Sequence, residues 1–347
     1  MSKPFFSIVI PTYNRKKSLI AAVKSVLRQE YKNFEIIISD NASSKDPLPT
    51  LKKLKDRRIK YFRNDKNIYF ARNLYKAIKL ATGKYVFILG DDDLILEKGC
   101  LSRLHSLIKK THVGYIRMGF IFYMNDDLSN LFLRSSFRDI KKPQLNLKVN
   151  NYQIIKYLYN SQFGFMSGVV FKNDPKIHIL ELEKTKDDKF QMEYFWLKFI
   201  FPALKKYGGV IDNENLILAT WSTYRVPHFY DVVGNQIYLE NGWKLFFEYL
   251  TPKERKRWIK EQTDWLIPIL PSIKFHSSNS NLWKHLKRSI ELNPNLLTNP
   301  KFYIFSAAAF LMPKFIWRLL RRLYFQLNTY NSDSINQSLE VLKKDIT

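Results

Sequence analysis

Three consecutive aspartates, Asp91, Asp92 and Asp93, are the residues whose type and spacing most plainly indicate chemistry. They directly follow Tyr85–Leu89, an apolar run typical of a buried strand. Adjacent carboxylates repel one another, so a fold keeps three together mainly where a cation lies between them. Hard divalent ions such as Mg²⁺ and Mn²⁺ take oxygen ligands and commonly link one or two carboxylates to substrate phosphates. The run therefore predicts a metal–phosphate site. The structural alternative is a solvated acidic turn that caps a helix starting near Leu96.

Polar residues also follow the other apolar runs of the N-terminal third. Thr12-Tyr13-Asn14-Arg15 ends the first run, Asp40 ends the second, and Ala71-Arg72-Asn73 begins a helical pattern. An open α/β sheet binds its ligands at the carboxyl ends of its strands, and helix N-termini there attract phosphates. We therefore expect these segments to meet the aspartates in one cleft.

Composition narrows the protein classes. The 347 residues carry a net charge of +26 and one cysteine, Cys100. Such a charge favours polyanionic partners, which are nucleic acid, an anionic membrane or phosphorylated substrates. One cysteine excludes an internal disulfide framework and fits a reducing cytoplasm. No run has the ~18–20 apolar residues of a membrane-spanning helix, and residues 5–10 read as a strand and not as a secretory signal.

The elements that must position these residues alternate along the first third. Strands are expected at 6–10, 34–39, 59–62 and 85–89, and helices at 16–29, 72–81 and 98–109. This order predicts an α/β fold with a mostly parallel sheet covered by helices on both faces. Further strands are expected at 113–122, 163–171 and 210–211, and further helices at 152–159 and 190–206.

Beyond residue 236 the pattern is helical. We therefore predict two domains, 1–235 and a helical region over 236–347. The first would divide into two halves, 1–120 and 121–235.

At this point the chain resembles a known family. Ser7–Arg15, Ser39–Ser43, Ala71–Asn73 and Gly83–Asp93 are similar to the motifs of the inverting family 2 glycosyltransferases, which have the GT-A fold. The Ser39–Ser43 and Gly90–Asp93 versions resemble bacterial enzymes that assemble surface polysaccharides, including the abequosyltransferase-like branch. The resemblance is specific over residues 5–115 and weaker to about residue 225.

The resemblance implies a nucleotide-sugar donor site in the half 1–120, an acceptor half over 121–235, and a divalent metal, Mn²⁺ or Mg²⁺. Asp40 would hydrogen-bond the base, and Asp91 and Asp93 would form the motif that meets the metal. The residues implied at the nucleotide-sugar are Pro11, Thr12, Tyr13, Arg15, Asp40, Arg72, Asp91 and Asp92.

The catalytic base of an inverting transfer is implied less clearly. The family supplies it from an acidic pair opening a late helix, and this chain offers Asp187, Asp188 and Glu193. Each has a structural alternative, as a helix cap or a solvated helix residue. His228 could be a further metal or diphosphate ligand, or a surface histidine. The glycine common in the family after its second asparagine is missing, because Asn67-Ile68-Tyr69 occupies that place.

The leading hypothesis is a metal-dependent inverting glycosyltransferase of bacterial surface polysaccharide synthesis, with a lipid-linked glycan as acceptor. The basic, aromatic segment 314–325 lacks acidic residues, which is typical of a helix lying on anionic lipid. An ordinary C-terminal helix packed on its own domain is the alternative. We expect a cytoplasmic protein, peripheral at the inner face of the cell membrane and open to oligomerisation. A nucleotidyltransferase, a basic nucleic-acid-binding protein and an inactive scaffold are the alternative functions.

Overall fold

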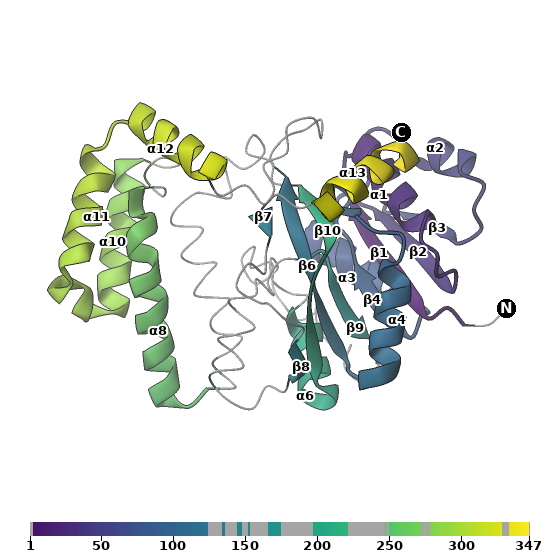
Figure 1. Ribbon diagram of the computed structural model, residues 1–347, viewed down its shortest axis with the longest axis horizontal. Coiled ribbons are helices and arrows are strands. Elements are labelled where there is room, and N and C mark those ends of the chain that lie inside the picture. The colour runs from purple at the N-terminus through teal and green to yellow at the C-terminus, as the bar shows by residue number, and fades with distance from the viewer. Residues whose placement is uncertain are drawn as a thin grey trace. The chain divides into compact units, whose positions relative to one another are not determined.

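The computed structural model describes residues 3–123, 134–135, 144–147, 152, 166–174, 197–220, 247, 250–271, 274, 278–327 and 333–346. The chain divides into two compact units (Figure 1). Unit 1 comprises Met1–Trp221 together with Tyr330–Thr347, and unit 2 comprises Ser222–Thr329.

Unit 1 is built on one sheet with the strand order β3-β2-β1-β4-β9-β6-β10-β5. Its first four strands are mutually parallel, and their carboxyl ends therefore lie along one edge. The bounds of these strands are β1 Phe6–Thr12, β2 Phe34–Asp40, β3 Ile59–Arg63 and β4 Tyr85–Ile88. Strands β1, β2 and β4 consist of buried residues throughout, as expected for a parallel sheet covered on both faces.

The second half of the sheet changes direction. Strand β9, Val169–Lys172, pairs antiparallel with both β4 and β6. Strands β6, Tyr115–Tyr123, and β10, Gly209–Thr220, run parallel to each other, and β10 also pairs antiparallel with β5, Leu94–Ile95. The reversal at β9 carries the segment just before Val169 to the carboxyl end of β4.

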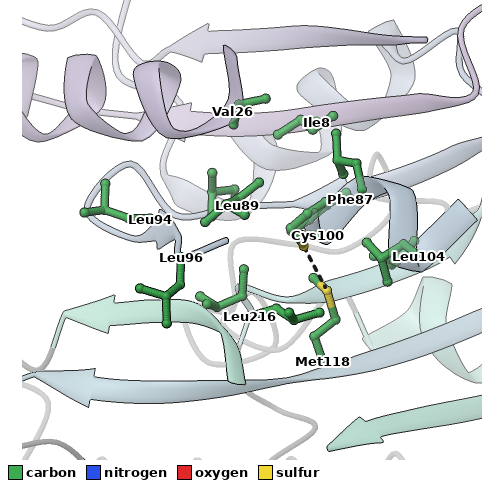
Figure 2. Close-up of a cluster of buried hydrophobic side chains, with 14 of the residues drawn as sticks. Ile8, Val26, Phe87, Leu89, Leu94, Leu96, Cys100, Leu104, Met118 and Leu216 are labelled. Atoms are coloured by element: carbon green, nitrogen blue, oxygen red, sulfur yellow. Dashed lines mark hydrogen bonds between the residues drawn. The ribbon is translucent and has the colours of Figure 1, made fainter. Parts of the chain in front are cut away.

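Helices cover both faces of this sheet. Helices α1, Lys16–Leu27, and α4, Cys100–Thr111, contribute buried side chains to one apolar cluster. Because side chains alternate along a strand, Ile8 and Ile10 join this cluster while Val9 does not. Helix α3, Phe70–Leu80, packs on β1 and β2 and contributes nothing to that cluster. Figure 2 shows part of the cluster, where the Cys100 thiol meets the Met118 sulfur at 3.8 Å.

Helix α13, Asp333–Ile346, belongs to unit 1 although it follows unit 2 in sequence. It packs against α1 (Figure 1). Ile335, Leu339 and Leu342 are part of the unit 1 core. Asp345 accepts hydrogen bonds or ion pairs from Arg28 at 2.8 Å and Lys98 at 3.1 Å. The last helix therefore completes the core and is held by charge as well.

Unit 2 is helical wherever the structure describes it. Its helices are α8 Pro252–Leu266, α10 Asn279–Leu292, α11 Pro300–Leu311 and α12 Lys314–Leu327. Two 3₁₀ turns, Ile267–Ile269 and Pro294–Thr298, join them. Thr251 and Glu254 form a capping box at the start of α8, with Pro252 at the first helical position.

The predicted α/β class and parallel N-terminal sheet are confirmed. Among the described residues, four short elements were missed, which are β5, helix α2, Leu48–Lys53, and strands β7, Arg134–Ser135, and β8, Gln144–Leu147. The structural alternative for the aspartates is wrong, because Leu94–Ile95 form a strand and α4 begins only at Cys100. The predicted helix 190–206 is confirmed over its described part by α6, Leu197–Tyr207. Residues 190–196, the predicted boundary at residue 235 and the predicted helix 152–159 apart from Tyr152 lie outside the described residues.

Candidate active site

A cavity of about 320 Å³ opens at the carboxyl edge of the parallel strands. It is lined from four strand ends, by Thr12 and Tyr13 at the end of β1, by Asn41 after β2, by Asn67 after β3, and by Asp91 and Asp92 after β4. Arg15, which precedes α1, also lines it. This is where open α/β sheets bind ligands, as the sequence predicted.

Asp91 is the buried anion of this cavity. Its side chain accepts a hydrogen bond from the Thr12 hydroxyl at 2.7 Å and one from the Arg15 guanidinium at 3.0 Å. Burial raises the pKa of Asp91 to about 6, and the neighbouring Asp92 charge adds to this, although Arg15 and Thr12 oppose it. A buried carboxyl group with a raised pKa is a candidate for binding a cation or transferring a proton.

The three aspartates point to different partners. Arg15 bridges Asp91 and Asp92, reaching the Asp92 carboxylate at 2.7 Å. Asp93 instead accepts a short hydrogen bond from the Ser167 hydroxyl, which itself accepts from the Gly90 amide at 2.8 Å. A Cβ atom on Gly90 would lie 2.7 Å from the Asp93 carboxylate. Glycine at position 90 therefore lets Asp93 fold back against the backbone.

A fully buried arginine lies behind this arrangement. Arg117 of β6 donates a hydrogen bond to the Ser167 carbonyl at 2.6 Å, and its guanidinium stacks over the Phe120 ring at 4.7 Å. Burial lowers the pKa of Arg117 to about 10, opposed by the charges of Tyr115 and Asp93. Arg117 thus supplies a fixed positive charge behind the carboxylates.

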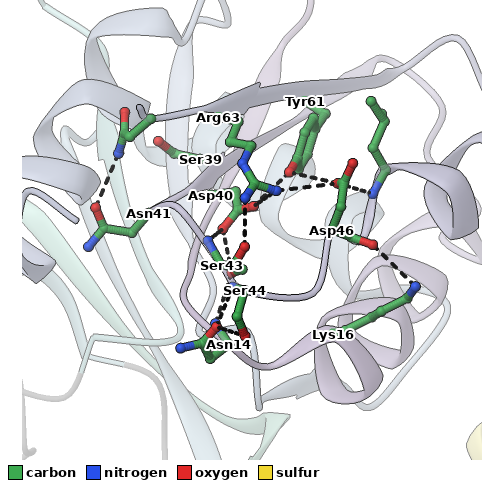
Figure 3. A network of polar contacts seen from close by, with 12 residues as sticks. Asn14, Lys16, Ser39, Asp40, Asn41, Ser43, Ser44, Asp46, Tyr61 and Arg63 are labelled. Atoms are coloured by element: carbon green, nitrogen blue, oxygen red, sulfur yellow. Dashed lines mark hydrogen bonds and ion pairs between the residues drawn. The ribbon is translucent and has the colours of Figure 1, made fainter. Parts of the chain in front are cut away.

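Asp40 lies beside the cavity in a separate polar network (Figure 3). One of its oxygens accepts from the Ser43 amide at 3.0 Å and from the Ser43 hydroxyl, and the other accepts from the Tyr61 hydroxyl at 2.6 Å. Arg63 adds an ion pair at 3.6 Å. Burial and the Asp40 carboxylate raise the pKa of Tyr61. In this arrangement Asp40 shapes the loop between β2 and α2.

Asparagine side chains join the ends of β2 and β3 to the start of α3. The Asn73 amide donates to the Ser39 carbonyl at 2.8 Å and accepts from Asn64 at 2.8 Å. Asn41 donates to the Asn67 side chain at 2.7 Å. Asn41, Asn67 and Asn73 also line the cavity. This wall of the cavity is therefore built from neutral amides, whereas the wall after β4 is acidic.

The acidic side chains after β4 decide whether the cavity can hold a metal ion. Within the described parts of the chain, no group of three or more His, Cys, Asp or Glu residues could hold a metal ion by itself. Mg²⁺ and Mn²⁺ commonly use one or two protein carboxylates and complete their shell with phosphates and water. The carboxylates of Asp91 and Asp92 line the cavity and fit this pattern, whereas Asp93 lies outside the lining and accepts from Ser167.

The structure gathers most of the residues predicted at the nucleotide-sugar. Cavity-lining positions are occupied by Pro11, Thr12, Tyr13, Arg15, Asp91 and Asp92. Asp40, Arg72 and Asp93 do not line the cavity. Their predicted contacts with base, diphosphate and metal stay predictions, as do those of the lining residues. The three candidate bases Asp187, Asp188 and Glu193, and His228, lie outside the described residues.

Several residues of this region were not assigned to the donor site from the sequence. Ser167, in the turn before β9, donates to Asp93, and Arg117 of β6 donates to the Ser167 carbonyl. Asn41, Asn67 and Tyr69 form a wall of the cavity. The sequence predicted only a strand over 163–171, without a role for Ser167. The sequence signal for Ser167 was the glycine that follows it, because glycine often marks a tight turn. In the structure Gly168 has a φ of 80°.

Comparison with known proteins finds glycosyltransferases among the relatives of this chain. An uncharacterized glycosyltransferase of Methanocaldococcus jannaschii is 26% identical over 264 residues, which cover 71% of this chain and 87% of the relative. A UDP-Glc:alpha-D-GlcNAc-diphosphoundecaprenol beta-1,3-glucosyltransferase of Escherichia coli is 40% identical over 101 residues, covering 28% of this chain and 39% of the relative.

A solved structure supports the fold. A mannosyltransferase from Pyrobaculum calidifontis, determined with GDP-Man and Mn²⁺, aligns with a TM-score of 0.50 at 14% identity, over 95% of this chain and 86% of the other. Its fold is of the GT-A type expected from the sequence. Residues 7–170, which contain the aspartate run, the cavity-lining strand ends and Ser167, match the glycosyl transferase family 2 domain. This part of the chain is therefore similar to glycosyl transferase family 2.

Proposed function

We propose that this protein transfers a sugar from a nucleoside diphosphate to a hydroxyl group of a lipid-linked glycan, with inversion at the anomeric carbon. The observation that carries the proposal is the cavity itself, in which a buried carboxylate, an arginine and neutral amides meet at the carboxyl edge of a family 2 domain. The match to the family supports the reaction class, and the residues of the cavity give it a physical basis.

The two walls suit the two ends of such a donor. Strand order places Asn67, after β3, three strand spacings from Asp91, after β4, which is about 14 Å. That span suits an extended nucleoside diphosphate, with its base against the asparagines and its phosphates towards the aspartates. Tyr13, which is 45% exposed and lines the cavity, offers an aromatic face between them.

The charge that develops during transfer falls at the acidic wall. The bond between the anomeric carbon and the phosphate oxygen breaks, and the nucleoside diphosphate leaves with additional negative charge. Arg15 lies at this wall and is already oriented by Asp91 and Asp92. Fixed donors of this kind stabilise developing charge better than mobile water. A bound Mn²⁺ or Mg²⁺ would supply the remaining positive charge.

Inversion requires a base on the opposite side of the sugar, which takes the proton of the acceptor hydroxyl as its oxygen bonds to the anomeric carbon. Glu193, Asp187 and Asp188 remain the candidates. The Escherichia coli relative acts on a diphosphoundecaprenol acceptor. We extend that acceptor class to this chain, together with a role in bacterial surface polysaccharide synthesis.

A lipid-linked acceptor places the reaction at a membrane, and we propose peripheral attachment at the inner face through α12. No helix among those the structure describes is long and apolar enough to cross a bilayer. Phe315, Leu319 and Leu323 of α12 are 70%, 57% and 44% exposed. The helix contains four basic residues and no acidic one, a composition that favours the surface of an anionic bilayer.

A donor-binding panel tests the enzyme proposal. UDP-, TDP-, GDP- and CDP-sugars are each added with Mn²⁺, Mg²⁺ or EDTA, and the melting temperature is measured. A ligand that binds only the folded state raises this temperature. We expect one nucleotide class to do so and EDTA to remove the effect. A panel without any shift, repeated with anionic vesicles, would contradict the proposal.

The products distinguish this function from the nucleotidyltransferase hypothesis. A glycosyltransferase releases a nucleoside diphosphate, whereas a nucleotidyltransferase acting on a sugar phosphate releases pyrophosphate. The family match favours the first. Release of pyrophosphate from a nucleoside triphosphate would contradict it.

A further inference from the structure

Tyr69 has a backbone conformation that residues other than glycine rarely adopt. Its φ of 64° and ψ of 164° lie in a region used almost only by glycine. The sequence resemblance placed a glycine of the family in this segment, and tyrosine stands here instead. The backbone has kept the glycine geometry while carrying a large side chain, so the residue is strained.

Packing in the interior does not explain this strain. Tyr69 is 66% exposed, so its ring gains little from burial. A residue that is strained in the backbone and exposed at the side chain contributes little to folding at that position. Strain of this kind persists where the surroundings fix it, and it gathers at ligand-binding sites.

The surroundings of Tyr69 do fix it. Its amide donates to the Asn67 side chain at 2.8 Å, and Asn67 accepts a second hydrogen bond from Asn41. Asn41 in turn accepts from the Ile68 amide at 2.9 Å. The Tyr69 carbonyl accepts the Asn73 amide at 3.1 Å, at the first turn of α3. The turn is thereby tied to the end of β2 and to α3 on either side of the strained residue.

The ring lies at the amide wall of the cavity. Tyr69 and Phe70, which is 41% exposed, line it together with Asn41 and Asn67. In the proposed function, on which this inference rests, that wall faces the nucleoside and the acidic wall faces the phosphates. Aromatic rings bind nucleobases by stacking.

We propose that Tyr69 is a specificity-determining residue whose ring covers the nucleoside of the donor, and that the strained turn exists to hold the ring there. The family's glycine would leave that side of the cavity open. The chain accepts a less favourable backbone in exchange for an additional contact with the donor.

Three variants separate the ring from the backbone. Tyr69→Gly removes both ring and strain, Tyr69→Ala removes the ring only, and Tyr69→Phe keeps the ring without its hydroxyl. The probe is whichever of UDP, TDP, GDP and CDP the full-length wild-type protein binds most tightly with Mn²⁺, measured by titration calorimetry. We expect the Kd to rise about tenfold in the glycine and alanine variants and to stay within twofold in Tyr69→Phe.

Stability supplies the second readout. The Tyr69→Gly variant should melt about 2 °C or more above the wild type without ligand, because glycine adopts this backbone freely. His112→Gly is the matched control, since His112 also has a positive φ of 56° but ends α4 outside the cavity lining. It should leave the nucleotide Kd unchanged.

Two results would overturn the inference while leaving the proposed function intact. One is an unchanged Kd in Tyr69→Gly, and the other is a melting temperature that falls in that variant, which would make the ring a part of the fold. A wild-type protein that binds none of the four nucleotides would instead overturn the proposed function and this inference together.

Discussion

The sheet edge of unit 1 buries polar side chains, whereas helix α12 of unit 2 exposes apolar ones. At the sheet edge, charged and polar side chains are buried and satisfied by named partners, as Asp91 is by Thr12 and Arg15. On α12, apolar side chains such as Phe315 and Leu319 are exposed. The first arrangement fixes geometry before a ligand arrives. The second leaves apolar area available for a partner.

This difference suggests a division of tasks. Buried polar groups are costly unless satisfied, so a fold retains them where orientation matters. Exposed apolar groups gain free energy only when something covers them, so a contiguous set of them indicates binding. Variants at each place should therefore fail in different assays.

The largest effect is expected at the acidic wall. Asp91→Asn keeps the shape and the Thr12 contact but removes the charge that orients Arg15. We expect turnover to fall by about 10²–10³-fold with little change in melting temperature. The measurement is the nucleoside diphosphate released. The control is Asp264→Asn, which removes the carboxylate of an exposed ion pair with Lys260 in α8. Equal turnover in Asp91→Asn and wild type would remove Asp91 from the site.

The scaffold beneath the site should respond in stability and in its pH dependence. Buried Glu35 accepts from Ser7 at 2.6 Å, Thr82 at 2.7 Å and Lys60 at 2.5 Å. Burial alone would raise the pKa of Glu35, but these hydrogen bonds outweigh it and lower the pKa. Glu35→Gln should cost about 2–4 kcal/mol at pH 7, measured by urea unfolding.

The sign of the pH effect follows from that lowered pKa. The stabilisation is complete above the unfolded value of about 4.3 and is lost as pH falls through the folded value. The wild type should therefore lose more stability than Glu35→Gln between pH 6 and pH 3. Parallel pH curves for the two proteins would contradict the prediction.

Variants of helix α12 should lose membrane binding and keep stability and donor binding. Leu319→Glu combined with Leu323→Glu places acidic groups on its exposed apolar residues. We expect partitioning onto phosphatidylglycerol vesicles to fall at least about tenfold, with melting temperature and donor binding unchanged. Val341→Glu on α13, also an exposed aliphatic position, is the control. Binding of the double variant equal to the control would assign the apolar face another partner.

The smallest effect is expected at an exposed ion pair. Glu261 pairs with Arg257 at 2.9 Å across one turn of α8. Glu261→Gln should change the free energy of unfolding by less than about 0.5 kcal/mol. Measured beside Glu35→Gln, it separates a buried carboxylate network from a solvated one. A loss as large as that of Glu35→Gln would show that unit 2 also depends on fixed charges.

The sequence predicted the parts of the site that are local. Asp91, Thr12 and Arg15 each adjoin an apolar run, so strand ends and cleft could be placed from pattern alone. Ser167 could not, because it meets Asp93 across 74 residues through the antiparallel strand β9. Arg117 looked like one polar residue in an apolar strand, and nothing local indicated its partner.

The same limit applied to the fold. Strand β10 was expected over 210–211 but spans Gly209–Thr220. The polar run Asp212–Asn215 interrupts its apolar pattern, and the register shifts there against β6. Pairing with β6 extends β10 beyond its apolar residues. A short stretch of sequence cannot show this, because β6 lies far away along the chain.

The position of α13 bears on how the protein is made. Its side chains Ile335, Leu339 and Leu342 belong to the core that supports β1 and α1. During synthesis, every residue of unit 2 leaves the ribosome before this helix does. Unit 1 therefore completes its core only after the whole of unit 2 has been synthesised.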